Sequence, residues 1–139
     1  MRVDPENSVF LDFHRTRDLT LTAAGSSGIE GIGRPRVEPS FIPDVIDRML
    51  RVSTADSYAA MHCLASLIGK SYGASTGTDF FGALVLAREM LAAGESGSIV
   101  FLACDSGDRY LDTYYDKGWL ASQGYDLEEN IGSIRKICE

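Results

Sequence analysis

Short apolar runs occur along this chain of 139 residues at places that suit β-strands. Residues 8–13, 51–53 and 98–103 each combine branched or aromatic side chains with the length of a strand. The run within 98–103 is almost continuously apolar, which is typical of a strand covered on both faces. A further short strand is expected at 70–72, so the pattern predicts several short strands joined by longer segments.

Helical spacing of apolar residues occupies much of the remaining chain. Apolar residues three or four positions apart predict helices over 43–50, 54–68 and 78–93, and further helices within 109–122. Residues 130–138 form either a last helix or a loosely docked tail. Because strands and helices alternate, we expect an α/β fold with an open parallel or mixed sheet flanked by helices.

The segment from 15 to 40 has no sustained period and is rich in Gly, Ser, Pro, Arg and Thr. A loop of this length inside a compact domain is more often functional than idle. It contains the sequence Gly28-Ile29-Glu30-Gly31-Ile32-Gly33, in which glycine backbone can pass close to a flat ligand. Two interpretations remain open: a loop that shapes a site or an interface, and a flexible surface loop.

A glycine-framed turn precedes the third expected helix. Gly73 and Gly77 allow a sharp turn with Ser75 at its tip. The unpaired N–H groups and the positive dipole end of the helix then lie beside the hydroxyls of Ser75 and Thr76, which suits a polar ligand. Ser75 and Asp105 both follow predicted strands, at the edge where parallel sheets bind ligands. A capped turn without a ligand is the alternative.

Two known motifs are excluded at this turn. Gly73-Ala74-Ser75-Thr76-Gly77 matches the G-x-S-x-G nucleophile elbow, which needs an acid and then a histidine later in the chain. The only histidines, His14 and His62, both precede Ser75, so that triad cannot be built. A phosphate-binding P-loop needs lysine after its glycines, whereas Lys70 lies before them.

Composition and charge narrow the possible partners. The length and the 45% hydrophobic content suit one domain over 1–139. A formal charge of −7 without a basic block argues against nucleic acid and against anionic membrane surfaces. We find neither a membrane-spanning apolar stretch nor a pattern typical of a signal peptide, so a soluble, cytoplasmic protein is expected. Cys63 and Cys104 lie in apolar runs and are expected in the core, and neither a zinc site nor a disulfide framework is expected.

Three motifs follow one another along the chain: Ile29-Glu30-Gly31-Ile32-Gly33, Gly73-Ala74-Ser75-Thr76-Gly77 and the segment from Cys104 to Thr113. In this order they resemble the C-terminal half of the cysteine synthase and cystathionine β-synthase family of pyridoxal 5′-phosphate (PLP) enzymes. The resemblance extends over nearly the whole chain and implies a single partial domain, the C-terminal part of the fold type II large domain. The segment from Gly33 to Pro39 is similar to the actinobacterial branch that includes cysteine desulfhydrase-like members.

The resemblance also implies which residues face the cofactor. Ser75 would contact the pyridine nitrogen of PLP as a neutral hydroxyl, which leaves that nitrogen largely unprotonated and favours loss of a β-substituent from an amino-acid substrate. The backbone of Gly31, Ile32 and Gly33 would border the cofactor and substrate. Thr76 would pack the helix terminus or place its hydroxyl near the ring. No catalytic residue and no metal ligand is implied within these residues.

The family's covalent lysine, substrate-carboxylate loop and phosphate loop have no counterpart among these residues. Lys70, Lys117 and Lys136 lie outside any matching motif, and Cys104 stands where the family commonly has proline. The resemblance implies that the chain is inactive alone. A partner chain carrying the N-terminal half would complete a heteromeric split enzyme for β-elimination or β-replacement on a serine- or cysteine-derived amino acid. The alternatives are an inert regulatory subunit that docks on a complete enzyme of the family, and a truncated or degenerate copy.

Overall fold

A computed structural model describes residues 1–138 of the protein. The chain divides into two compact units, Met1–Thr54 (unit 1) and Ala55–Glu139 (unit 2), and each has its own buried apolar core. The expectation of a single domain over 1–139 stays a prediction. Among the described helices, we find none that is both long enough and apolar enough to cross a bilayer.

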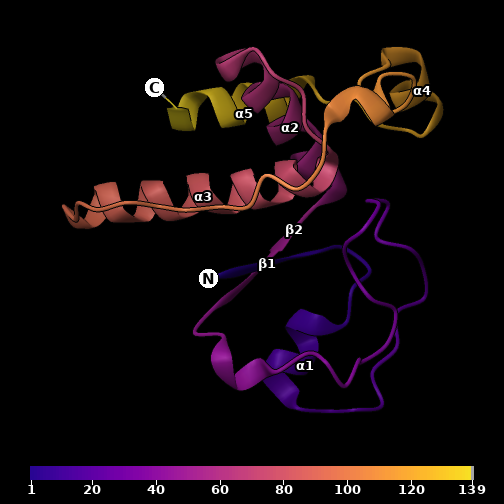
Figure 1. Ribbon diagram of the computed structural model, residues 1–139, viewed down its shortest axis with the longest axis vertical. Helices are drawn as coiled ribbons and strands as arrows, with labels where there is room; N and C mark the ends of the chain where they lie inside the picture. Colours follow the sequence, from indigo (N-terminus) through magenta and orange to yellow (C-terminus); the bar gives the residue numbers. More distant parts are fainter. Residues whose placement is uncertain (139) are drawn as a thin grey trace. The chain divides into compact units, whose positions relative to one another are not determined.

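Unit 1 is built on a pair of parallel strands, β1 (Arg2–Pro5) and β2 (Met49–Val52) (Figure 1). The register pairs Arg2 with Met49 and Pro5 with Val52. Parallel strands cannot be joined by a tight turn, so the chain between them makes a long crossover. The crossover contains α1 (Phe10–Thr16), the extended loop of the glycine motif and the 3-10 turn η1 (Pro43–Val45).

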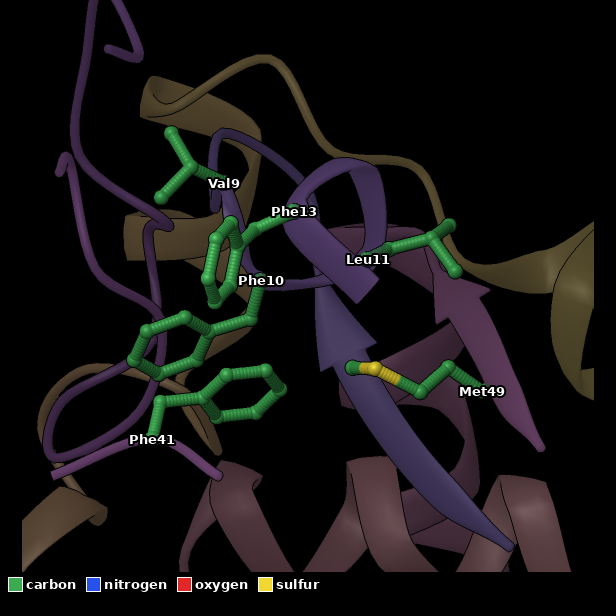
Figure 2. Close-up of a cluster of buried hydrophobic side chains, with 6 residues drawn as sticks. All are labelled: Val9, Phe10, Leu11, Phe13, Phe41 and Met49. Carbon is green, nitrogen blue, oxygen red and sulfur yellow. The ribbon is translucent and has the colours of Figure 1, made fainter. Parts of the chain in front are cut away.

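The core of unit 1 gathers side chains from the helix, the loop and the second strand (Figure 2). The rings of Phe10 and Phe41 stack with their centroids 4.2 Å apart, and Phe13 packs against Phe41 at 6.0 Å. Burial of these aromatic rings is a main source of stability in so small a unit. The buried cluster consists of Val9, Phe10, Leu11, Phe13, Phe41 and Met49.

Two predictions for unit 1 are wrong. Residues 8–13, predicted as a strand, contain the start of helix α1, because a tertiary contact caps it: the buried Asp4 carboxylate accepts the Leu11 N–H at 2.9 Å. Burial raises the pKa of Asp4. The helix predicted over 43–50 is only one 3-10 turn, and β2 begins at Met49. The strand predicted at 51–53 is confirmed in kind, with earlier bounds.

Unit 2 is helical. The helix predicted over 54–68 is confirmed, and the last residues form the helix α5 (Glu128–Cys138). This helix docks through the buried Ile134 and through Asn130, whose Nδ2 donates to Asp56 Oδ1 at 2.7 Å. Ala59, Cys63 and Phe80 join Ile134 in the core. The helical elements are α2 (Thr54–Ile68), α3 (Ala74–Ala93), the 3-10 turn η2 (Gly107–Tyr110), α4 (Lys117–Ser122) and α5 (Glu128–Cys138).

Helix α3 begins at Ala74, four residues before its predicted start, and ends as predicted at Gly94, where φ is 67°. Gly77 therefore lies inside the helix and does not form a turn. A Cβ at this position would collide with the Ser57 carbonyl oxygen and would lie 2.8 Å from Met61 Cβ. Glycine is required here because α2 and α3 approach closely, and backbone freedom is not the reason.

Residues 98–103, predicted as a strand covered on both faces, make no strand ladder with any described residue. The segment runs extended beside α3 (Figure 1), and the rings of Phe101 and Phe80 lie 5.6 Å apart. Val100 is 92% exposed and Leu102 is 68% exposed. The prediction of a strand at 70–72 reduces to an isolated bridge between Tyr72 and Ser106.

Candidate functional site at the start of helix α3

Ser75 lies in the first turn of α3, with Gly73 as the N-cap residue. Gly73 has an ordinary extended conformation, with φ −70° and ψ 166°. Because glycine has no side chain, the N-cap residue itself does not cap the first N–H groups of the helix. The first N–H groups of a helix have no partner within the helix, so the backbone at Ala74 and Ser75 presents donors and the positive end of the helix dipole. The predicted juxtaposition of hydroxyls with a helix N-terminus is confirmed, although Ser75 does not occupy a turn tip.

The three hydroxyls of this first stretch have different surroundings. Thr76 is fully buried and its Oγ1 accepts the Cys104 N–H at 2.9 Å. Thr78, also fully buried, donates through Oγ1 to Ser57 Oγ at 2.9 Å or to the Ala74 carbonyl at 3.0 Å. Ser75 is 7% exposed, and its hydroxyl makes no hydrogen bond with any other described residue. Of the three, only Ser75 combines residual exposure with a hydroxyl that makes no hydrogen bond to another described residue, so it is the one most accessible to a ligand.

Asp105 is held directly beside this turn. The Gly73 N–H donates to the Asp105 carbonyl at 3.1 Å, and the Tyr110 hydroxyl donates to Asp105 Oδ2 at 2.7 Å. A Cβ on Gly73 would collide with Asp105 Oδ1 and lie 2.9 Å from Tyr110 Cε2, so glycine is required for this close approach. The expectation that Gly73–Gly77 and Asp105 lie together is confirmed, while the strands expected to bring them there are absent from the described residues.

The second predicted segment, Gly31, Ile32 and Gly33, lies in unit 1. Gly31 and Gly33 have φ values of 87° and 79°, the left-handed region that favours glycine. No atom lies within 4 Å of a Cβ built on Gly31, whereas one on Gly33 would lie 2.7 Å from Ser27 Cβ. The loop borders a pocket of 490 Å³ that is also lined by polar side chains of Asn7, Ser26, Glu30 and Arg34.

Ser27 organises this glycine loop and was not predicted as a site residue. Its buried hydroxyl lies 2.9 Å from the Ile29 carbonyl and 2.8 Å from the Ile32 carbonyl. Thr54 Oγ1 donates to the Ser27 carbonyl at 3.1 Å. The only sequence signal is that Ser27 directly precedes Gly28, and a serine in this position is common in loops of many kinds.

Two other titratable side chains of unit 2, Tyr58 and His62, have pKa values shifted mainly by burial. Burial, followed by the neighbouring Tyr114 and Tyr125, raises the pKa of Tyr58. Burial lowers the pKa of His62, whose Nε2 donates to the Tyr114 carbonyl at 2.9 Å. No cluster of three or more potential metal ligands occurs in residues 1–138.

The cysteines differ from one another. Cys63 is buried, as predicted. Cys104 is exposed, so its predicted core position is wrong, because the apolar run before it lacks a covering layer among the described residues. The side chain of Cys138 lies outside the described residues.

Several known proteins are similar to this chain, although no family model matches it. The L-cysteine desulfhydrase Cds1 of Mycobacterium tuberculosis strain H37Ra is 50% identical over 124 residues, which make up 89% of this chain and 34% of that protein. Cysteine synthase 1 of Emericella nidulans is 28% identical over 123 residues, or 87% of this chain and 32% of that protein. Cystathionine beta-synthase of Rattus norvegicus is 28% identical over 127 residues, or 91% of this chain and 22% of that protein.

The fold is similar to that of a solved structure. The crystal structure of cysteine synthase from Entamoeba histolytica superposes with a TM-score of 0.67 at 22% identity, over 97% of this chain and 35% of that one. The chain spans 22% to 34% of the length of the three relatives named above. The sequence and fold together show that the chain belongs to the cysteine synthase and cystathionine β-synthase family of fold type II PLP enzymes and corresponds to the C-terminal part of that fold.

Proposed function

We propose that this chain supplies one wall of a PLP site in an enzyme that carries out β-elimination or β-replacement on a serine- or cysteine-derived amino acid. Support comes from family membership and from relatives named as cysteine desulfhydrase and cysteine synthase. The observation that carries the proposal is the Ser75 hydroxyl, which is almost buried at the start of α3 and makes no hydrogen bond with any other described residue.

The surroundings of Ser75 fit the pyridine nitrogen of PLP. A neutral hydroxyl donates one hydrogen bond to an unprotonated ring nitrogen, and a nearly buried hydroxyl needs such a partner. The positive end of the α3 dipole beside Ser75 disfavours an additional proton on that nitrogen. When bound, PLP withdraws electrons from the substrate's α-carbon, and a less protonated ring suits loss of a β-substituent.

Thr76 and the glycine loop have supporting roles in this proposal. Thr76 would act on the cofactor site indirectly, because its Oγ1 accepts the Cys104 N–H and so holds the helical turn that carries Ser75. Gly31, Ile32 and Gly33 would present backbone groups to the cofactor or substrate, since no atom lies within 4 Å of a Cβ at Gly31. Ser27 would keep that loop in shape through its contacts with the Ile29 and Ile32 carbonyls.

The lysine and the phosphate loop would come from an N-terminal segment on a partner chain. None of Lys70, Lys117 and Lys136 lies in a motif that resembles the family's covalent lysine. In this proposal the two chains assemble into a heteromeric enzyme, and these 139 residues are inactive alone. The partner requirement rests on the missing motifs, whereas the role of Ser75 rests on the family motif and is supported by its nearly buried hydroxyl, which makes no hydrogen bond with any other described residue.

Co-expression tests the proposal. The chain is produced with a polypeptide that corresponds to the part of Mycobacterium tuberculosis Cds1 preceding the matched region, and the purified mixture is titrated with PLP. We expect a cofactor absorbance band and cysteine or O-acetylserine turnover only when both polypeptides are present. Ser75→Ala should lower turnover about tenfold or more and shift the band, whereas the exposed Ser133→Ala should change neither. An unchanged band and turnover in Ser75→Ala would indicate a docking subunit and contradict the proposed role.

A further inference from the structure

Unit 2 contains a pocket of 340 Å³, which we call the α4 pocket. Its lining residues come from α2, from α4, from the start of α5 and from the loop that joins α4 to α5. The volume is at the lower end of the range of small-molecule sites, about 300–1,000 Å³. Neither Ser75 nor any residue of the glycine loop lines this pocket. A ligand of the α4 pocket would therefore be a small molecule that does not contact the candidate site.

The most buried side chains of the α4 pocket are aliphatic. Leu120 is 5% exposed and Leu127 is 7% exposed, and the partly buried Ile131 lines the same pocket. Contact with these side chains removes apolar surface of a ligand from water, which favours binding. The floor of the pocket therefore favours a ligand with an apolar body over one that is polar throughout.

The rim of the α4 pocket carries charges of both signs that do not pair with one another. Lys117, Asp126 and Glu128 are exposed residues that line the pocket. No ion pair joins Lys117 to Asp126, to Glu128 or to any other described residue. A ligand that carries both a carboxylate and an ammonium group can satisfy both signs. A ligand with several negative charges would be repelled by the two rim carboxylates.

His62 adds a hydrogen-bond acceptor to the α4 pocket. Its Nε2 donates to the Tyr114 carbonyl at 2.9 Å, so Nδ1 carries no proton in the neutral ring. Burial, and to a smaller extent the ammonium of Lys117, lowers the pKa of His62, which keeps the ring neutral near neutral pH. Nδ1 makes no hydrogen bond with any described residue. His62 can therefore accept a hydrogen bond from an ammonium group but offers no further donor to a carboxylate.

We propose that the α4 pocket binds a free α-amino acid with an apolar side chain about the size of that of leucine or methionine. The side chain of the ligand contacts the aliphatic floor, and its carboxylate pairs with Lys117. Its ammonium group faces His62 and the carboxylates of Asp126 and Glu128. The rim has one ammonium against two carboxylates, so a zwitterion matches it better than a simple carboxylic acid. The proposal does not depend on the proposed function, since binding needs neither PLP nor a partner chain.

Titration of the full chain with L-leucine tests the α4 pocket. Binding is followed by ¹H–¹⁵N NMR, in which shifts of the Leu120, Ala121 and Ile131 amides locate the ligand. Three analogues each remove one part of the ligand. Isocaproate lacks the ammonium group, isoamylamine lacks the carboxylate, and glycine lacks the apolar side chain.

Two variants with matched controls test the lining residues. Lys117→Gln removes the ammonium of the rim, and Lys136→Gln makes the same change at an exposed lysine outside the pocket. Ala121→Trp fills the pocket from its rim, and Ala92→Trp places the same ring on an exposed position of α3. All four positions are exposed, so these variants should fold.

We expect saturable binding of L-leucine with a dissociation constant of about 1 mM or below. Lys117→Gln should weaken it about fivefold and Ala121→Trp at least about tenfold, whereas the two controls and Ser75→Ala should leave it unchanged. Isocaproate and isoamylamine should bind about fivefold more weakly than leucine, because each lacks one charge. Glycine should bind at least about tenfold more weakly, because it cannot contact the aliphatic floor.

Several results would overturn the proposal. They are the absence of saturable binding, an equal effect of either variant and its control, and an analogue that binds as tightly as leucine. Loss of binding in Ser75→Ala would also overturn it, because the amino acid would then occupy the start of α3. Failure of the proposed function leaves these expectations unchanged, so the two proposals can fail separately.

Discussion

Met49–Val52 and residues 98–103 are both short segments rich in large apolar side chains, but their environments are opposite. Strand β2 pairs in parallel with β1 and buries Met49 and Val52. Residues 98–103 are mostly exposed, although the Phe101 ring packs against Phe80 of α3, and no described strand pairs with their edges. The comparison shows that an apolar run with a strand-like pattern forms a strand only where another strand pairs with it. No residue among 1–138 pairs with 98–103 in this way.

The largest effect is expected from Val52→Asp. Val52 is buried in β2, so an aspartate there would leave an unpaired charge in the core of unit 1. We expect a loss of about 3–5 kcal/mol in the free energy of unfolding of unit 1, enough to unfold it. Hydrogen exchange read separately for the two units would show the loss of protection. Persistent protection of β1 and β2 amides would contradict the packing described for this pair.

A smaller effect is expected from Thr76→Val. This substitution keeps the shape of the side chain but removes the oxygen that accepts the Cys104 N–H. The free energy of unfolding of unit 2 should fall by about 1 kcal/mol, because Cys104 is exposed and its N–H can bond to water instead. Amides near 104–107 should exchange faster while the core of unit 2 keeps its protection. Thr76→Ser retains the acceptor and is the matched control. If both variants behaved alike, the hydroxyl would not be the anchor.

The two units should respond oppositely to mild acid. The pKa of Asp4 is raised by burial, so the folded state holds its proton more tightly and this group adds stability to unit 1 as the pH falls through its folded pKa toward 3.8. The pKa of His62 is lowered, chiefly by burial, so the unfolded chain takes up its proton first and unit 2 loses stability as the pH falls below 6.5.

The measurement is unfolding of each unit followed by hydrogen exchange between about pH 7 and about pH 4. Asp4→Asn and His62→Gln should remove the respective slopes. A stability of unit 2 that rises on acidification and is unaffected by His62→Gln would contradict the second assignment.

The smallest effect is expected from Val100→Asp in the chain alone. Val100 is almost fully exposed, so the free energy of unfolding should change by no more than about 0.5 kcal/mol. The contrast with Val52→Asp, the same substitution in the paired run, sharpens the comparison in a single thermal or chemical unfolding series. Comparable losses in both variants would show that Val100 is covered within the chain.

Local sequence sufficed where the partner of an element is near in the chain. The helix at Thr54–Ile68 and the glycine stop at Gly94 follow from apolar spacing and from the left-handed conformation that glycine allows. Helix α1 could not be predicted, because its cap is Asp4 on a strand that has no apolar run of its own. Such tertiary contacts override local pattern.

The sequence was enough to predict which residues form the candidate site, but not the contacts that explain why those residues are there. The G-x-S-x-G motif identified the start of α3, yet Gly77 is glycine because the Ser57 carbonyl approaches it. Nothing in the sequence distinguished Thr76, which is bonded to Cys104, from Ser75, which has no partner among the described residues. Ser27 was missed because a buried serine in a loop has no sequence pattern of its own.

The central claim is that Ser75 faces the ring nitrogen of PLP, and ¹⁵N NMR of labelled cofactor in the assembled enzyme tests it most directly. The account predicts a signal of an unprotonated, hydrogen-bonded pyridine nitrogen, which loses its hydrogen-bond shift in Ser75→Ala and moves toward the protonated position in Ser75→Asp. A nitrogen signal that is identical in all three proteins, with equal PLP occupancy, would contradict it.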